Sequence, residues 1–177
     1  MEQQKSWQNQ WITLLLIALG ACARIAPHPW NFTPMMAIGL YAGARSAKLW
    51  VGVLVTMATL LASDVILGFY TGMWYVYAAS LIPVLLGWLA RRQPRRRVAF
   101  LAASAIVSGV SFFVITNAAV WATGNLYPHT WGGLATCFTA AIPFYRNQIA
   151  GDALYTYALF GGDALFRAAL YSKPEVA

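Results

Sequence analysis

The chain has 177 residues, of which 60% are hydrophobic and 10% are charged, and its formal net charge is +7 at pH 7. Soluble domains carry about 25% charged residues, so this chain has too few charges to cover a water-facing surface. A nucleic-acid-binding protein is not expected either, because no basic and aromatic groove accompanies the positive charge. The composition predicts an integral membrane protein, with lipid as the solvent for most of its surface.

Six apolar stretches predict membrane-spanning helices, since a span needs about 20 mostly apolar residues. A polar tail precedes the first stretch and no small-residue cleavage pattern follows it, so we expect an uncleaved span rather than a signal peptide. The second stretch is short and rich in Gly and Ala, and we expect it to take residues from both flanks. In chain order the predicted spans are 11–26, 32–44, 49–69, 73–90, 98–123 and 147–166.

The stretch "GNLYPHTWGGLATCFTAAIPFYR" separates the fifth and sixth spans. It is too long for a turn and too short for a loop with another span, so it predicts a short interfacial or re-entrant helix over 133–144, buried in protein or lining a cavity. The expected fold is therefore all-α, a six-transmembrane-helix bundle that forms one domain over residues 11–166. Residues 1–10 and 167–177 are expected to be its cytoplasmic tails.

The basic residues predict the orientation, because Lys and Arg gather in cytoplasmic loops. With the N-terminus inside, ten of the twelve basic residues fall on the cytoplasmic side, including the run "RRQPRRR". Six spans with both termini cytoplasmic satisfy every loop, whereas seven would place Arg167 and Lys173 outside. Asp163 lies four residues before Arg167, which predicts an ion pair at the inner end of the last span.

The remaining charged residues converge on the outer side. Arg24 and Arg146 fall at the outer face, and Asp64 and Asp152 lie one or two turns inside their spans, where an ionisable group usually faces a partner or a wet cavity. Aromatic residues of "GFYTGMWYVY" lie at the same level. The candidate ligand-binding residues are Arg24, His28, Asn31, Asp64, Tyr70, Trp74, Tyr77, Ser80, Arg146, Asn147 and Asp152.

Each of these residues also has a structural interpretation. Arg24 and Asp64 could form one ion pair that closes the bundle, and Arg146 with Asn147 and Asp152 could anchor the last helix. His28 could be a rigid loop residue between two prolines, and Trp74 could belong to an interfacial aromatic belt. The two cysteines, Cys22 and Cys137, lie in apolar stretches without metal-binding spacing and are expected to be packing residues.

No hydrolase, zinc-protease, nucleotide-binding or calcium-binding motif occurs, so we expect a binding protein rather than an enzyme, without a cofactor. Two alternatives stay open. One is a membrane enzyme that acts on a lipid or prenyl head group with Asp64 or Asp152 as base. The other is a non-catalytic accessory membrane subunit.

Three segments carry a resemblance to a known family: "RIAPHPWNFTP", "ASDVILGFYTGMWYVY" and "PFYRNQIAGDALYTYALFG". They resemble small bacterial membrane proteins similar to the S-components of energy-coupling-factor vitamin transporters, among them the BtuM-type solitary cobalamin transporters. The resemblance implies a multi-pass protein of the bacterial cytoplasmic (inner) membrane that takes up a vitamin or related micronutrient, a corrinoid first. It leaves open whether the protein acts alone or with an energising module of the energy-coupling-factor type.

By this resemblance His28, Asp64 and Arg146 match positions near the corrinoid pocket. The family's cobalt-binding cysteine would fall between Tyr70 and Ser80, where this chain has none. Ser80 or Tyr77 takes its place, and neither is a soft ligand. His28 is then a possible ligand of the corrinoid cobalt, and no other metal site is expected.

The orientation can be tested by cysteine labelling in intact cells, on a chain whose two native cysteines have been replaced. A Gln93→Cys variant should not react with a membrane-impermeant maleimide, because residue 93 lies in the arginine-rich loop that we place inside. A Leu126→Cys variant should react. The reverse labelling pattern would eliminate the six-span topology.

Overall fold

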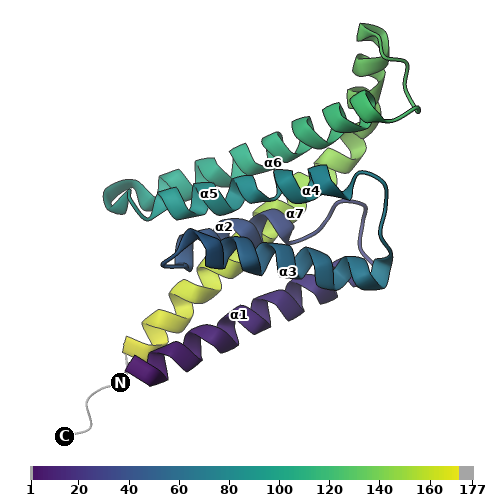
Figure 1. Cartoon of the computed structure of the whole chain (residues 1–177). Coiled ribbons are helices and arrows are strands. Elements are labelled where there is room, and N and C mark those ends of the chain that lie inside the picture. The colour runs from purple at the N-terminus through teal and green to yellow at the C-terminus, as the bar shows by residue number, and fades with distance from the viewer. Residues whose placement is uncertain (1, 172–177) are drawn as a thin grey trace, which may run out of the picture.

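The structure is a computed structural model that describes residues 2–171, with side chains described for residues 13–169. Every regular element in this part of the chain is helical (Figure 1). The helices are α1 (Glu2–Ile25), α2 (Met35–Arg45), α3 (Leu49–Leu67), α4 (Met73–Ala79), α5 (Leu81–Ala90), the 3₁₀ turn η1 (Pro94–Arg96), α6 (Arg97–Thr123) and α7 (Trp131–Tyr171). The predicted all-helical class is confirmed.

Three helical segments are long and apolar enough to cross a membrane. They are Leu49–Leu67, Met73–Ala90 and Pro94–Thr123, and they correspond to the third, fourth and fifth predicted spans. A shorter apolar helix covers Thr13–Ile25. These helices are compatible with a membrane protein, and the count of six spans stays a prediction.

The second predicted span is a half-length helix in the centre of the bundle. α2 has 11 residues, about 16 Å at 1.5 Å per residue, roughly half of a 30 Å hydrocarbon core. All of its residues from Met35 to Ala44 are buried. The prediction that residues 32–44 form a span is therefore corrected at its start. Pro34 precedes the helix, and residues 26–34 form an irregular segment that includes two further prolines.

Two glycines allow α2 and α5 to touch along their backbones. A Cβ atom at Gly43 would collide with the carbonyl oxygen of Val84, and one at Gly87 would collide with the carbonyl oxygen of Leu40. Small residues at a helix interface permit this approach. Many atoms of the two helices then come into van der Waals contact, and their small attractions add up. The α2–α5 pair is consequently the tightest helix contact in which the short helix takes part.

The fourth predicted span is divided into α4 and α5. Pro83 has no N–H to donate to the carbonyl group of Ala79, four residues earlier, and its ring crowds that carbonyl. The helix accordingly breaks at Ser80, whose hydroxyl donates a hydrogen bond to the carbonyl oxygen of Val76 at 2.8 Å. α4 is left with only seven residues.

The expected short helix over 133–144 is not a separate element. It is the first part of α7, a continuous helix of 41 residues with Pro143 inside it. This part packs on α6, where Phe113 lies 5.5 Å from Phe138 and 4.4 Å from Tyr145 between ring centroids. This part of α7 packs on α6 as a continuous helix, so it does not form a separate re-entrant element. The start of α7 and the end of α6 project beyond the other helices (Figure 1).

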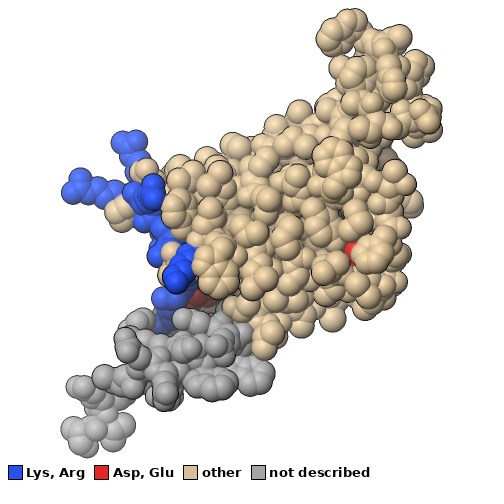
Figure 2. Space-filling model, in the orientation of Figure 1, with Lys and Arg blue, Asp and Glu red and all other residues tan. Residues whose placement is uncertain are grey.

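Lysine and arginine side chains gather at one end of the molecule on the face that Figure 2 shows. The α2–α3 and α5–α6 connections meet there: Arg91 donates a hydrogen bond to the carbonyl oxygen of Ala47 at 2.8 Å, and Arg97 donates one to that of Ala44 at 3.2 Å. The predicted pair of Asp163 with Arg167 is confirmed at 3.2 Å. This basic end is the end that the proposed orientation places in the cytoplasm.

The α2–α5 contact predicts a large effect from a small substitution. Gly43→Ala should lower the unfolding midpoint in detergent, because overpacking of this kind costs about 1–3 kcal/mol. Gly162→Ala is the matched control, since nothing lies within 4 Å of a Cβ atom at that position of α7. Equal midpoints for the two variants would contradict the close packing.

Candidate ligand-binding site

A cavity of about 610 Å³ lies at the N-terminal end of α2, in the space that a full-length helix would occupy. Its wall draws residues from α1, α2, α3, α4, α6, α7 and two connecting segments. The volume falls within the range of about 300–1,000 Å³ that is typical of small-molecule sites. Of the predicted ligand residues, those that line it are Arg24, Asn31, Tyr70, Ser80 and Asp152.

An ion pair joins α1 to α3 behind this cavity. Nη2 of Arg24 lies 2.9 Å from Oδ1 of Asp64, and the side chains are 13% and 0% exposed. Nη1 of Arg24 also donates a hydrogen bond to Oγ of Ser63 at 2.6 Å. The Arg24–Asp64 contact has the distance of an ion pair but not the angle of a hydrogen bond, since Oδ1 has no hydrogen-bond partner in the described part of the chain. The pair considered as a structural alternative is thus present.

Tyr77 completes this network from α4. Its hydroxyl donates a hydrogen bond of 2.9 Å to Oδ2 of Asp64. Neither Asp64 nor Tyr77 lines the cavity, whereas Arg24 does. A buried carboxylate that loses its partners is costly, so Asp64 and Tyr77 act on the cavity by holding the Arg24 guanidinium at its wall.

Tyr70 reaches the cavity from the connection between α3 and α4. Gly68 and Gly72 flank it with φ angles of +93° and +85°, a backbone conformation that glycine adopts at little steric cost. Burial raises the pKa of the Tyr70 phenol, and the nearby charge of Asp64 adds to the effect. The phenol is therefore neutral at physiological pH and can both donate and accept a hydrogen bond.

The irregular segment 26–34 forms another part of the wall and is attached to α7. Nδ2 of Asn147 donates a hydrogen bond of 3.1 Å to the carbonyl oxygen of Trp30. The ring centroids of Phe32 and Tyr155 lie 5.7 Å apart. Asn31, which lines the cavity, has a φ of +63°, and asparagine tolerates this left-handed conformation better than most residues. Asn147 thus holds the wall without lining it.

Asp152 lies between this cavity and a second hollow, because it lines both. Asp152 is 6% exposed, and its Oδ2 accepts a hydrogen bond of 3.4 Å from Gln148. Gln148 also donates to the carbonyl oxygen of Gly109 at 3.0 Å, and a Cβ atom at Gly109 would lie 2.9 Å from Oδ2 of Asp152. Oδ1 of Asp152 has no hydrogen-bond partner among the residues described. A buried polar atom of this kind is available to a ligand or to water.

The other predicted residues lie outside the cavity lining. Nδ1 of His28 is 2.6 Å from the carbonyl oxygen of Ala26, and the residue is half-buried but does not line the cavity. Trp74 is 65% exposed and packs edge-on against Tyr75. Arg146 is exposed and takes part in no ion pair within the described residues. These positions agree with the loop and interfacial-belt alternatives more closely than with direct contact to a ligand.

Sequence reasoning missed several lining residues, among them Thr33, Phe112, Thr116 and Gln148. One signal could have found one of them. Gln148 lies four residues before the predicted Asp152, so the two share one face of a helix. The two cysteines do not line the cavity, and the described residues contain no group of three or more metal-ligating side chains.

A double-mutant cycle can measure the Arg24–Asp64 pair. Arg24→Met and Asp64→Asn should each lower the free energy of unfolding by about 3–5 kcal/mol, because each leaves one buried charge without its partner. The double variant should lose clearly less than the sum of the two single losses. Additive losses in detergent denaturation would show that the two side chains are not coupled.

The comparison with known proteins finds one family match that covers almost the whole chain. The chain matches a family of unknown function (DUF6580) over residues 4–174. The matched range contains the whole cavity lining and the Arg24–Asp64 pair, so both lie within the family's domain. No curated protein and no solved structure matches the chain. The chain belongs to the DUF6580 family, whose function is unknown.

Proposed function

We propose that this protein is a six-span, S-component-like membrane protein that binds a vitamin-sized micronutrient for uptake from the outer side. The observation that carries the proposal is the 610 Å³ cavity, to which α1, the α4–α5 break and α7 bring Arg24, Ser80 and Asp152. Both termini are then cytoplasmic, in a bacterial inner membrane, and the cavity opens at the end opposite to the basic end. A few convergent polar groups in an otherwise apolar cavity are typical of a ligand site.

The chemistry of the wall favours a ligand with a negative group and a planar ring. The guanidinium of Arg24 supplies N–H donors at the wall, although Asp64 balances its charge, and the uncapped N-terminus of α2 adds the partial positive charge of its first N–H groups. Met35 and Met36, the first residues of that helix, line the cavity. Tyr75 and Phe112 supply aromatic surface on the same wall. A carboxylate or phosphate near Arg24 and a ring system against the aromatic side chains fit this arrangement.

The corrinoids are the first compounds to test, followed by smaller vitamins. The cavity volume is that of a smaller vitamin, and it would hold only part of a corrinoid. Neither cysteine nor His28 lines the cavity, so a corrinoid would be held by its periphery rather than through its cobalt. We propose no metal coordination.

The geometry favours binding over catalysis. The enzyme alternative needs Asp64 or Asp152 as a base, and Asp64 is paired with Arg24 and Tyr77 behind the wall. Asp152 alone lines the cavity, without a second acid beside it in the described lining. The proposal includes two modes of uptake: the protein acts alone, or it acts with an energising partner module.

A thermal-shift screen of the purified full chain tests the proposal. Corrinoids, riboflavin, thiamin, folate and biotin are added separately, and a specific ligand should raise the unfolding midpoint by mass action. Thr116→Phe should abolish the shift because the new ring occupies the cavity. Thr123→Phe is the matched control: both hydroxyls donate to the carbonyl oxygen four residues earlier, but Thr123 lies outside the cavity.

Each result of this screen has a defined meaning. A shift that Thr116→Phe removes and Thr123→Phe keeps supports binding in the cavity. A shift that survives in both variants places the ligand elsewhere and contradicts the site. The absence of any shift across the panel, with a stable partner protein that co-purifies with the chain, favours the accessory-subunit alternative.

A further inference from the structure

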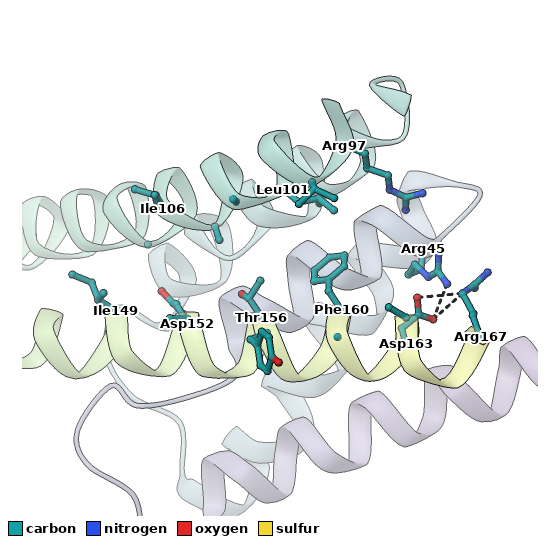
Figure 3. Close-up of a pocket in the computed structure, with 18 of the residues that line it drawn as sticks. Arg45, Arg97, Leu101, Ile106, Ile149, Asp152, Thr156, Phe160, Asp163 and Arg167 are labelled. Atoms are coloured by element: carbon teal, nitrogen blue, oxygen red, sulfur yellow. Dashed lines mark hydrogen bonds and ion pairs between the residues drawn. The ribbon is translucent and has the colours of Figure 1, made fainter. Parts of the chain in front are cut away.

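A second hollow of about 730 Å³ runs between α6 and α7, on the side of Asp152 away from the first cavity (Figure 3). Ile149 and Asp152 lie at one end of it, and Arg45, Arg97, Asp163 and Arg167 lie at the other. We refer to this hollow as the α6–α7 groove. Its two ends differ in chemistry, because only the second end carries a cluster of basic side chains.

The walls of the groove are mostly apolar, with Thr156 as a polar residue among them, and the groove opens sideways. Leu101 and Phe160 form the inner wall, and Ala102 and Ala105 leave room where a larger side chain would fill the space. Along the rim the side chains are strongly exposed, with Val98 at 83% and Tyr157 at 80%. In a membrane this rim would face the hydrocarbon, so a lipid chain could enter from the side.

The basic end carries an excess of positive charge. Oδ1 of Asp163 accepts a hydrogen bond from Nη2 of Arg45 at 2.7 Å and another from Nε of Arg167 at 3.2 Å. Arg97 donates to the carbonyl oxygen of Ala44 and has no carboxylate partner among the residues described. Three arginines and one aspartate leave a net charge of +2. Figure 3 shows the guanidinium groups of Arg45, Arg97 and Arg167 directed toward the same end of the groove.

We propose that the α6–α7 groove binds one anionic phospholipid of the cytoplasmic leaflet. The phosphate lies at Arg97 and Arg167, and one acyl chain lies along the apolar walls toward Ile149. From Asp163 to Ile149 the helix rises about 21 Å, more than half of a hydrocarbon core of about 30 Å. Basic pockets between helices on the cytoplasmic side have the chemistry that binds anionic head groups.

Charge complementarity selects this occupant over others. A zwitterionic lipid would leave the net charge of +2 without compensation. A free anion would need no apolar groove of this length. A second copy of the chain is disfavoured, because its own net charge is +7 and its basic end would approach another basic end. The inference goes beyond the proposed function, since it concerns the opposite side of Asp152 and a different ligand.

Native mass spectrometry and thermal shift of the delipidated full chain in neutral detergent test the proposal. Phosphatidylglycerol should raise the unfolding midpoint and give a one-to-one adduct, whereas phosphatidylcholine with the same chains should do neither at equal concentration. Inorganic phosphate should have no effect either. Equal shifts with both lipids, an equal shift with phosphate alone, or a chain dimer in place of the lipid adduct would each overturn the proposal.

Two pairs of variants locate the binding. Arg97→Gln with Arg167→Gln should weaken phosphatidylglycerol binding by about tenfold or more. Arg95→Gln with Arg96→Gln removes the same charge from the exposed η1 turn outside the groove and should keep wild-type affinity. Equal losses in the two double variants would mean diffuse attraction to the basic end and would overturn the proposal.

A groove-filling pair keeps the test decisive if the arginine variants are unstable. Ala102→Phe places a ring in the groove, while Ala103→Phe places one on the neighbouring exposed position of α6 outside its lining. Ala102→Phe should remove the lipid adduct and Ala103→Phe should retain it. Retention of the adduct in both variants would place the acyl chain elsewhere and overturn the proposal.

Discussion

The burial of a helix that is too short to cross a membrane is the constraint on which the rest of the fold depends. α2 is buried from Met35 to Ala44, and its backbone touches that of α5 through Gly43 and Gly87. Once α2 occupies the centre at half length, the space beyond its first residue must be filled by something else. The irregular segment 26–34 and aromatic side chains line that space without filling it, and the cavity results.

The polar groups around this space are held from outside it. Asp64 takes its partners from α1 and α4, and Asn147 of α7 holds the carbonyl oxygen of Trp30. Asp64 and Asn147 therefore shape the cavity without lining it. A substitution at Asp64 would act first on stability and on the position of Arg24, and only through them on a ligand.

Hydropathy predicted the long elements well, because α3 and α6 need little from the rest of the chain to be recognised. It could not predict the half-length of α2, because a segment rich in Gly and Ala has the same hydropathy whether it forms a weak span or a short helix with a close-packing surface. It also separated a short helix over 133–144 from the last span at 147–166, because the polar residues between them interrupt the apolar pattern. In the structure Asn147 bonds to a neighbouring segment and α7 continues.

For the site, sequence reasoning named five residues that line the cavity but none from α2 or α6, and it could not assign directions to side chains. Arg24 and Asp152 line the cavity, whereas His28 and Arg146 share their level and face elsewhere. Depth along a span can be counted from residue number, but rotation about the helix axis depends on partners from other helices. The lining residues Thr116 and Gln148 carry no charge and gave no signal by depth.

The break at Ser80 has a mechanical consequence. α5 touches α2 along its backbone, whereas α4 beyond the break is held by the hydrogen bond of Tyr77 to Asp64 and by side-chain packing of Tyr77. A rotation of α4 about Ser80 would therefore move Tyr75 and Val76 at the cavity wall and leave the α2–α5 contact intact. The two parts of the fourth predicted span are thus held by different contacts, and α4 carries one wall of the cavity.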